Sequence, residues 1–450
     1  MTDLSLRTAG FTDSVIRRMT RISNQYGAVN LSQGFPDFEP PKEILERLAQ
    51  VTKEDFHQYA TTWGSQNFRD AVAAKQKHFM GYDIDPNSEI VVTCGSTEAM
   101  MAAMLSVTNP GDKVIVFSPF YENYGADAIL SGAEPIYVPL VPPEYSFDAD
   151  VLEAAFRQHP KALILCNPSN PCGKVFTREE LQIIADLAEK YDTYVITDEV
   201  YEHILYAPNR HVYFSTLPGM RKRTICCSSL SKTYSITGWR LGYVIAPPEI
   251  TDRVKKVHDF LTVGAAAPLQ EAAVVGLKFG DDYYKWLQDK YTHMRKLFLD
   301  GLDRIGIQHN VPQGAYYVMV DVSEFGYESD LRLCEALAEH VGVGAVPGSS
   351  FFRDTFVFHL RPDIQNTSVF FIDTVGFHLI HTIPDIAQPD RKLLCLPILK
   401  IFPDILLIQL IFRGKIIVVI ELFRIVTEDA VASMTICCQN TILPFSDIIR

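Results

Sequence analysis

A short polar segment, SSLSKTYSITGWRLG at residues 228–242, contains the residue type best suited to covalent chemistry. Lys232 stands among small hydroxyl residues, and Arg240 follows it eight positions later, between two hydrophobic runs. A lysine amine can form a Schiff base with an aldehyde, and an arginine guanidinium can bind a phosphate group. An ordinary solvated loop would also contain such residues. The rest of the chain must therefore decide between a reactive amine and a surface charge.

Three further polar groups follow apolar runs elsewhere in the chain. Asp198 comes directly after TYVIT, Asn170 lies in the turn after ALILC, and residues 95–97 (Gly-Ser-Thr) stand between EIVVT and a helical pattern. Each has an ordinary structural explanation: a loop or capping charge, proline-rich turn chemistry, or a helix N-cap without a ligand. Taken together they provide a carboxylate, an amide and an anion site, all at strand ends.

This combination meets the needs of pyridoxal 5'-phosphate (PLP). The phosphate needs amides, hydroxyls and an arginine, the ring nitrogen needs an anion, and the aldehyde needs a lysine. The ring's phenolate oxygen needs donors such as Asn170 and Tyr201. The flat ring needs a stacking partner, and Phe120 follows another strand end.

The polar residues named above must be positioned by strands and helices. The chain contains apolar runs, with helical patterns between several of them. The runs are 89–93, 113–118, 162–166, 193–197, 223–228 and 242–246, and the helical patterns include 97–107 and 178–190. Such runs are typical of strands buried on both faces of a mostly parallel sheet. Repeated βα units predict an α/β domain with helices on both faces, whose ligands bind beyond the carboxyl ends of the strands. A long helical stretch at about 280–305 then leads into a second, smaller domain.

Charge and cysteine usage narrow the class of protein. The net charge of −13 argues against nucleic acid or an acidic membrane surface as the main partner. Residues 1–20 contain no apolar core of a secretory signal. Nine cysteines are scattered without disulfide or metal-ligand spacing, so we expect a cytoplasmic protein without a metal and with most cysteines in its core.

The last ninety residues differ in composition from the rest. Residues 361–450 contain 18 isoleucines, against 19 in the preceding 360, and no tyrosine or tryptophan. The very apolar stretch 393–423 is interrupted by prolines and charges, which argues against a membrane span. This tail is either a buried segment of unusual composition or sequence foreign to the domain, as a frameshift or an insertion would leave.

The sequence resembles the fold-type-I PLP-dependent aminotransferases of class I/II, and within them the kynurenine/glutamine/methionine aminotransferase group. The resemblance covers about residues 10–355. Its segments include LSQGFPDFEPP (31–41), TCGSTEAM (93–100), NPSNPCGKVF (167–176), TDEVYEHI (197–204) and SSLSKTYSITGWRLGY (228–243). It implies a large PLP-binding α/β domain with a mostly parallel, doubly covered sheet and a smaller α+β domain. The expected limits are 1–45 for an N-terminal arm and part of the small domain, 46–290 for the large domain, 291–355 for the small domain and 356–450 for the atypical tail.

The resemblance also implies a role for each matching residue. Lys232 matches the catalytic lysine that forms the Schiff base and then moves the Cα proton. The residues that match cofactor contacts are Ser96, Thr97, Phe120, Asn170, Asp198, Tyr201, Ser229, Lys232, Arg240 and Tyr59. Asp198 matches the partner of the pyridine nitrogen. Tyr59 matches a tyrosine that reaches the phosphate of the neighbouring subunit, which implies a homodimer. Gly34 and Asn170 match contacts to the substrate.

One expected residue falls where the chain departs from the family. Members carry an arginine after the PGSSFF-like segment, which forks onto the α-carboxylate of the substrate. Arg361 stands at about the expected distance from Pro347, but the next residues, Pro362-Asp363-Ile364, do not continue as the family's strand does. Arg361 is therefore either this carboxylate clamp or a loop arginine in unrelated sequence.

The implied activity is the ping-pong transfer of an amino group between an L-amino acid and a 2-oxo acid, in amino-acid metabolism. Two rival functions stay open. A PLP-dependent C–S β-lyase would use the same lysine, and an impaired paralogue would bind PLP without turnover because of the altered tail. A PLP-dependent transcription regulator and a dinucleotide-dependent dehydrogenase are disfavoured, because no helix-turn-helix pattern precedes residue 30 and no G-x-G-x-x-G follows a strand.

Overall fold

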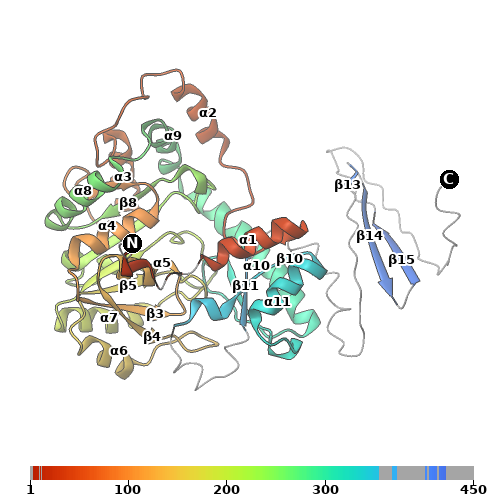
Figure 1. The fold of residues 1–450 in the computed structure, drawn as a ribbon. Helices are drawn as coiled ribbons and strands as arrows, with labels where there is room; N and C mark the ends of the chain where they lie inside the picture. The colour runs from red at the N-terminus through yellow and green to blue at the C-terminus, as the bar shows by residue number, and fades with distance from the viewer. Residues whose placement is uncertain are drawn as a thin grey trace. The chain divides into compact units, whose positions relative to one another are not determined.

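A computed structural model gives the fold of the chain (Figure 1). It describes residues 4–9, 11, 13–353, 367–371, 401–402, 405–412 and 415–421. Arg361 lies outside the described residues. The chain divides into two compact units, residues 1–391 and residues 392–450, and each is described by itself.

The centre of the first unit is a seven-stranded sheet with the order β2-β8-β7-β6-β5-β3-β4. Its strands are β2 (Ile90–Thr93), β3 (Lys113–Ser118), β4 (Glu134–Pro139), β5 (Ala162–Cys166), β6 (Tyr194–Asp198), β7 (Thr224–Ser229) and β8 (Gly242–Ile245). The pairs from β4 through β7 are parallel, and β8 runs antiparallel to both of its neighbours. The predicted α/β fold with a mostly parallel sheet is confirmed. The sequence analysis missed β4, because this partly exposed edge strand contains two prolines and no continuous apolar run.

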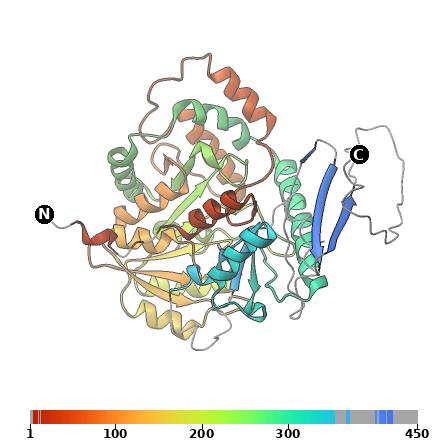
Figure 2. The ribbon, with the colours of Figure 1, turned by 45° about the vertical axis from the view of Figure 1, so that its right-hand side comes forward.

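Helices cover both faces of this sheet (Figures 1 and 2). They include α3 (Gln66–Met80), α4 (Ser96–Val107), α5 (Asn123–Leu130), α6 (Ala149–Phe156), α7 (Arg178–Lys190), α8 (Pro248–Thr262) and α9 (Ala267–Leu277). Side chains alternate between the faces along β5: Ile164 packs in one apolar cluster with α4, while Leu163 and Leu165 pack in another with α7. This two-sided burial explains the continuous apolar runs in the sequence.

Smaller sheets and further helices complete the first unit. A three-stranded antiparallel sheet contains β9 (Tyr317–Asp321), β11 (Val346–Pro347) and β12 (Thr367–Phe371), and β1 (Val29–Asn30) pairs in parallel with β10 (Val343–Gly344). The other helices are α1 (Val15–Tyr26), α2 (Lys42–Val51), α10 (Asp281–Ile305) and α11 (Asp330–Ala336). The helix predicted at about 280–305 is α10. The predicted domain limits stay a prediction, and β12 falls within the segment expected to be atypical.

The second unit contains an antiparallel sheet of β13 (Ile401–Phe402), β14 (Ile405–Phe412) and β15 (Lys415–Glu421). Its two longer strands read ILLIQLIF and KIIVVIE, and β-branched isoleucine and valine favour extended backbone. The isoleucine-rich composition of the tail thus corresponds to β-structure here. The foreign origin considered for the tail stays a hypothesis.

Two further findings concern the described residues alone. No helix among them is long and apolar enough to cross a membrane. Their six cysteines are all free thiols, and five of these are buried, as expected for core residues.

Candidate active site

The polar residues predicted at strand ends meet at one edge of the large sheet. Strands β5, β6 and β7 are neighbours, and their register aligns Cys166 with Asp198 and Asp198 with Cys227. Asn170 follows β5, Asp198 ends β6, and Ser229 ends β7. The carboxyl ends of parallel strands therefore bring together residues that lie up to 59 positions apart in the sequence (170 to 229).

Asp198 is a buried carboxylate held from two sides. The Tyr124 hydroxyl donates a hydrogen bond to its Oδ2 at 2.7 Å, and the Val200 N–H donates to its Oδ1 at 3.3 Å. Burial raises the pKa of Asp198 to about 6, and the bond from Tyr124 acts in the opposite direction. A cation placed next to this carboxylate would favour its charged form. The sequence analysis missed Tyr124, although it lies only four residues after Phe120 in SPFYENY.

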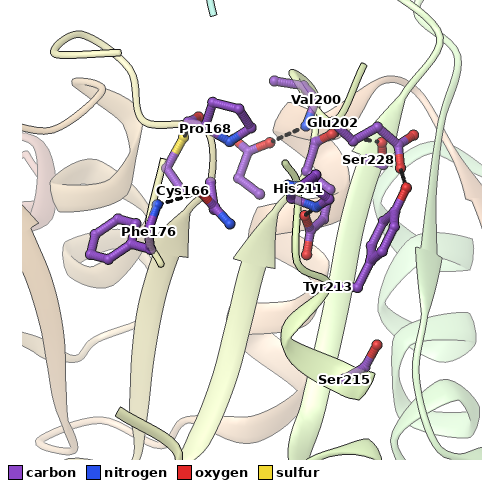
Figure 3. A network of polar contacts seen from close by, with 12 residues as sticks. Cys166, Pro168, Phe176, Val200, Glu202, His211, Tyr213, Ser215 and Ser228 are labelled. Carbon is purple, nitrogen blue, oxygen red and sulfur yellow. Dashed lines mark hydrogen bonds and ion pairs between the residues drawn. The ribbon is translucent and has the colours of Figure 1, made fainter. Parts of the chain in front are cut away.

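The loop after β6 is fixed by a buried polar network (Figure 3). His211 Nε2 lies 2.6 Å from a carboxylate oxygen of Glu199, and the Ser228 hydroxyl donates to the Glu199 carbonyl at 3.4 Å. The Tyr213 hydroxyl donates to Glu202 at 2.6 Å. These contacts come from the strand β7 and from the segment that precedes it, so the backbone next to Asp198 has little freedom.

Helix α3 supports the same loop through a buried ion pair. Lys75 Nζ lies 2.7 Å from Glu202 Oε1, and both side chains are almost fully buried. Burial is the largest single effect and would raise the pKa of Glu202, but the charge and hydrogen bond of Lys75, with His203 and Tyr213, together hold it well below its usual range. Removing one partner of such a pair leaves an uncompensated buried charge, which costs about 3–5 kcal/mol.

Lys232 lies in the loop after β7, with its amine directed into the site. Its Nζ donates a hydrogen bond to the Gly34 carbonyl at 2.6 Å, and the same carbonyl accepts from the Tyr316 hydroxyl at 3.1 Å. Burial, and then the charge of Arg240, lower the pKa of Lys232 to about 8, with Asp198 acting in the opposite direction. Near neutral pH this amine is therefore unprotonated to a far greater extent than an ordinary lysine, and a nucleophile or a base requires the unprotonated form.

Arg240 and the start of α4 form an anion cradle. A Cβ added to Gly242 would lie 2.5 Å from the Gly95 carbonyl carbon, and one added to Gly95 would overlap the Arg240 guanidinium. Two glycines thus allow α4 and Arg240 to approach closely. Arg240 itself has a φ of 53°, an uncommon left-handed conformation for a residue with a side chain.

The cradle lacks a negative charge of its own. Arg240 donates to the Thr237 carbonyl at 2.9 Å, and within the described part of the chain no carboxylate lies at ion-pair distance from it. Gly95 caps α4 without a side-chain hydrogen bond, so the first N–H groups of the helix, at Ser96 and Thr97, are open to a ligand. A fixed cation beside a helix N-terminus is suited to a phosphate. Ser229 adds a buried hydroxyl at the neighbouring strand end.

Three more predicted residues are buried and held by aromatic neighbours. Phe120 is buried and stacks on Tyr137, with ring centroids 5.1 Å apart. Asn170 Nδ2 donates to the Tyr317 hydroxyl at 3.1 Å, and the Tyr201 hydroxyl shares a short hydrogen bond with the same Tyr317 hydroxyl. Tyr317 was not among the predicted residues, although it stands in QGAYYVMVDVS (313–323), a segment that also resembles the family.

Two predicted residues are not brought into this group. Tyr59 lies in the loop between α2 and α3, and its side chain is 86% exposed. Within this chain it faces solvent, so its predicted contact requires a second subunit. Arg361 lies outside the described residues.

The donor set fits PLP. The cradle of Arg240 and α4 suits the phosphate, the carboxylate of Asp198 suits a protonated ring nitrogen, and the half-buried amine of Lys232 suits the aldehyde. The two glycines leave room where a Cβ would fill the cradle. The described residues contain no group of three or more histidine, cysteine, aspartate or glutamate side chains placed to hold a metal ion.

Comparisons with known proteins agree with this geometry. A sequence profile of the family "Aminotransferase class I and II" matches residues 26–357. A probable N-succinyldiaminopimelate aminotransferase of Mycobacterium tuberculosis is 36% identical over 77% of this chain and 87% of its own length. The methionine aminotransferase of Escherichia coli K12 is 34% identical over 76% of this chain and 89% of its own length. A kynurenine–oxoglutarate transaminase of the mouse is 34% identical over 77% and 82%.

Solved structures show the same likeness. The crystal structure of an Escherichia coli protein with a methionine aminotransferase function superposes with a TM-score of 0.80 at 31% identity, over 86% of this chain and all of the other. The N-succinyldiaminopimelate aminotransferase of M. tuberculosis superposes with a TM-score of 0.81 at 33% identity, over the same shares.

The lowered pKa of Lys232 predicts unusual reactivity in the cofactor-free protein. We expect trace acylation of Lys232, followed by mass spectrometry across a pH series, to reach half of its maximum near pH 8. Ordinary lysines in the same sample should do so near 10.4. Arg240→Gln should move the midpoint for Lys232 upward, because it removes a neighbouring cation. A midpoint for Lys232 equal to that of exposed lysines would contradict this account.

The close approach at Gly242 predicts a steric effect on phosphate binding. Gly242→Ala should displace the start of α4 and weaken PLP binding by at least about tenfold, because charge-assisted hydrogen bonds each contribute roughly 1.5–3 kcal/mol. Gly238→Ala is the matched control, since a Cβ there meets nothing within 4 Å. Equilibrium dialysis measures both affinities, and equal values for the two variants would refute the cradle geometry.

Proposed function

The chain belongs to the class I and II aminotransferases, and from this premise we propose that Lys232, Asp198 and Arg240 are the centre at which it works. Enzymes of this family use PLP to move an amino group between an amino acid and a 2-oxo acid, and this chain is such a transaminase. The observation that carries the proposal is the half-buried amine of Lys232, whose pKa is lowered to about 8. It lies at the strand ends between an anion cradle and a buried carboxylate.

Each residue has a distinct task in the proposed centre. PLP, when bound, supplies an aldehyde that reacts with amino groups and a ring that accepts the electrons released at the substrate's Cα. Arg240, Ser229 and the first turn of α4 hold the phosphate. Asp198 carries the negative charge that keeps the ring nitrogen protonated, and Tyr124 and Val200 fix its orientation.

Lys232 is proposed as both the attachment point and the base. An amine with a pKa near 8 can take a proton from the substrate's Cα at neutral pH and return it nearby, whereas an ordinary lysine would stay protonated. Phe120 is proposed to cover one face of the ring, and Asn170 and Tyr201 to donate to its oxygen. The shared bonds to Tyr317 hold both donors in place.

The substrate side of the centre is proposed from Gly34 and Asn170. The Gly34 carbonyl accepts the bond from Lys232, which puts the backbone of residue 34 beside the reacting amine. The backbone N–H of Gly34 and the side-chain amide of Asn170 can donate hydrogen bonds to the substrate's α-carboxylate. Arg361 stays the proposed clamp for the same carboxylate. The relatives are named for N-succinyldiaminopimelate, methionine and kynurenine. These share only the amino-acid group, which is what these residues would bind.

The rival functions are not favoured by the comparisons, since the relatives named above are aminotransferases. A β-lyase releases pyruvate from a cysteine conjugate without an acceptor, and an impaired paralogue shows no reaction with an amino acid. We further propose a cytoplasmic location, which the free thiols among the described residues support.

A two-stage reaction tests the proposed function. We expect the PLP-loaded protein to convert methionine once, in an amount equal to the enzyme, and to continue only after a 2-oxo acid is added. Lys232→Ala should lower the rate by at least about 100-fold, as expected for the loss of a general base. Lys285→Ala, an exposed lysine on α10, is the control. Pyruvate release from a cysteine conjugate without an acceptor, or no conversion at all, would favour one of the two rivals.

We also propose that the protein is a homodimer, joined in part through an apolar patch near Tyr59. The patch contains Tyr59, Phe260, Leu261 and Val263, and Phe260 is 91% exposed. The loop that contains Tyr59 and the end of α8 that contains Phe260 are held together, because His258 Nε2 lies 2.8 Å from the Thr62 carbonyl. Clustered exposed apolar side chains are typical of protein interfaces.

The dimer proposal predicts that a charge in this patch separates the subunits. Phe260→Glu should shift the protein towards monomers in sedimentation velocity runs, because it places a carboxylate where the partner would pack. Ile183→Glu, at an exposed apolar position on α7, should leave the assembly unchanged. A monomeric parent protein, or a Phe260→Glu variant that stays dimeric, would contradict the proposal.

A further inference from the structure

A buried ion pair lies behind the anion cradle and has no part in the proposed chemistry. Glu98 follows Ser96 and Thr97 in the first turn of α4, and His258 lies in the last two turns of α8. His258 Nδ1 is 2.6 Å from Glu98 Oε1, and the side chains are 0% and 8% exposed. Charged groups are buried this deeply only when they are paired and hydrogen-bonded. The hydrogen bonds of this pair therefore show which segments of the chain it holds together.

The contacts of His258 require a charged imidazole ring. Its second nitrogen, Nε2, lies 2.8 Å from the Thr62 carbonyl oxygen. A carbonyl and a carboxylate are both acceptors, so each ring nitrogen must carry a proton. Burial is the largest single effect and would lower the pKa of His258, but the bond to Glu98, the charge of Glu98 and the bond to Thr62 together raise it above its ordinary value.

Glu98 is correspondingly a carboxylate. It accepts hydrogen bonds from the Cys94 N–H at 2.5 Å and from the Thr262 hydroxyl at 2.9 Å, in addition to the bond from His258. Burial is the largest single effect and would raise the pKa of Glu98, but the bond and charge of His258 together with the bonds from Cys94 and Thr262 lower it. The hydrogen-bond geometry and the directions of the two pKa shifts therefore agree that His258 is a cation and Glu98 an anion.

The pair joins three segments that are remote in the sequence. The first is the turn of α4 that forms the cradle. The second is the loop before α3, in which Thr62 follows Tyr59 by three residues. The third is the end of α8 with the exposed Phe260 and with Val263, whose φ of 66° is a rare conformation for a β-branched residue. Strained backbone of this kind persists only where surrounding contacts fix it.

We propose that the His258–Glu98 ion pair positions the loop before α3, which contains Tyr59, against the anion cradle formed by Arg240 and the start of α4. We call this ion pair the latch. Neither His258 nor Glu98 is among the residues proposed above to hold PLP or the substrate, so both are positioning residues. Only a charged imidazole can hold Glu98 and the Thr62 carbonyl together, because a neutral ring can donate to one of them and not to both. The functional part of this inference rests on the PLP site proposed above.

The test uses His258→Gln in the full-length protein, with His309→Gln as the matched control. His309 is also a buried histidine between a carboxylate and a carbonyl: its ring nitrogens lie 3.1 Å from Asp303 Oδ1 and 2.8 Å from the Asn310 carbonyl. It lies just after α10 and contacts none of the three segments. Each variant removes an imidazole that contacts a carboxylate and a carbonyl, but Asp303 is 72% exposed whereas Glu98 is 8% exposed, so the control removes the more exposed of the two pairs.

Two readouts separate the latch from the PLP site. In cofactor-free protein, His258→Gln should increase hydrogen exchange of the amides in residues 57–64, while peptides from β6 exchange as in the parent. In loaded protein, the affinity for PLP should fall by about 10-fold or more, the range typical for the loss of a residue that orients binding groups from behind. His309→Gln should leave both readouts unchanged.

Each outcome supports or overturns either the latch or its role in the anion cradle. Unchanged exchange in residues 57–64 of His258→Gln overturns the latch, and increased exchange with unchanged PLP affinity overturns its role in the cradle. If the parent protein fails to bind PLP, the proposed function is wrong, but the exchange result still tests the latch. If His258→Gln does not fold, Thr262→Val keeps both charges and removes one donor to Glu98. It should then show smaller changes in the same direction, and no change would refute the proposal.

Discussion

Burial of the Lys232 amine near the Arg240 cation is the interaction on which the chemistry proposed for this protein depends. The desolvated amine, with Arg240 as the neighbouring cation, has a pKa of about 8. The carboxylate of Asp198 opposes this shift, so the balance depends on the positions of all three groups. The register of β5, β6 and β7 and the close approach of α4 to Gly242 fix those positions. The same geometry that lowers the pKa of the lysine also leaves Arg240 without an ion-pair partner among the residues that the structure describes.

The scaffold around the site contains several features that are unfavourable on their own. Arg240 and Val263 have left-handed backbone conformations, and two ion pairs, Lys75–Glu202 and His258–Glu98, are buried. Buried ion pairs contribute little net stability compared with apolar packing, but they impose one arrangement on the elements that they join. Here each pair joins a helix or a loop to the backbone beside the site. This placement suits a role in positioning rather than in stability alone.

Much of the fold, and the residues that meet at the candidate site, could be predicted from the sequence, because local segments specify them. Six of the seven strands of the large sheet correspond to continuous apolar runs, and Lys232 and Arg240 stand in one segment of fifteen residues, 228–242. Residues that act through long-range contacts could not be found this way. Tyr317 lies 147 positions from Asn170, and His258 lies 160 positions from Glu98. Tyrosine and histidine in such places look like ordinary core residues until the fold brings their partners near. The edge strand β4 was missed for a local reason, because its sequence EPIYVP contains two prolines and no continuous apolar run.

The central claim is that Lys232, and no other lysine, bonds to the cofactor. Borohydride makes a linkage between lysine and PLP permanent, so the most direct measurement is peptide mapping by mass spectrometry of the PLP-loaded protein after borohydride reduction. The account predicts a single modified peptide that contains residues 228–242, with the added mass on Lys232. Modification of a different lysine, or labelling spread over exposed lysines with none at Lys232, would contradict it.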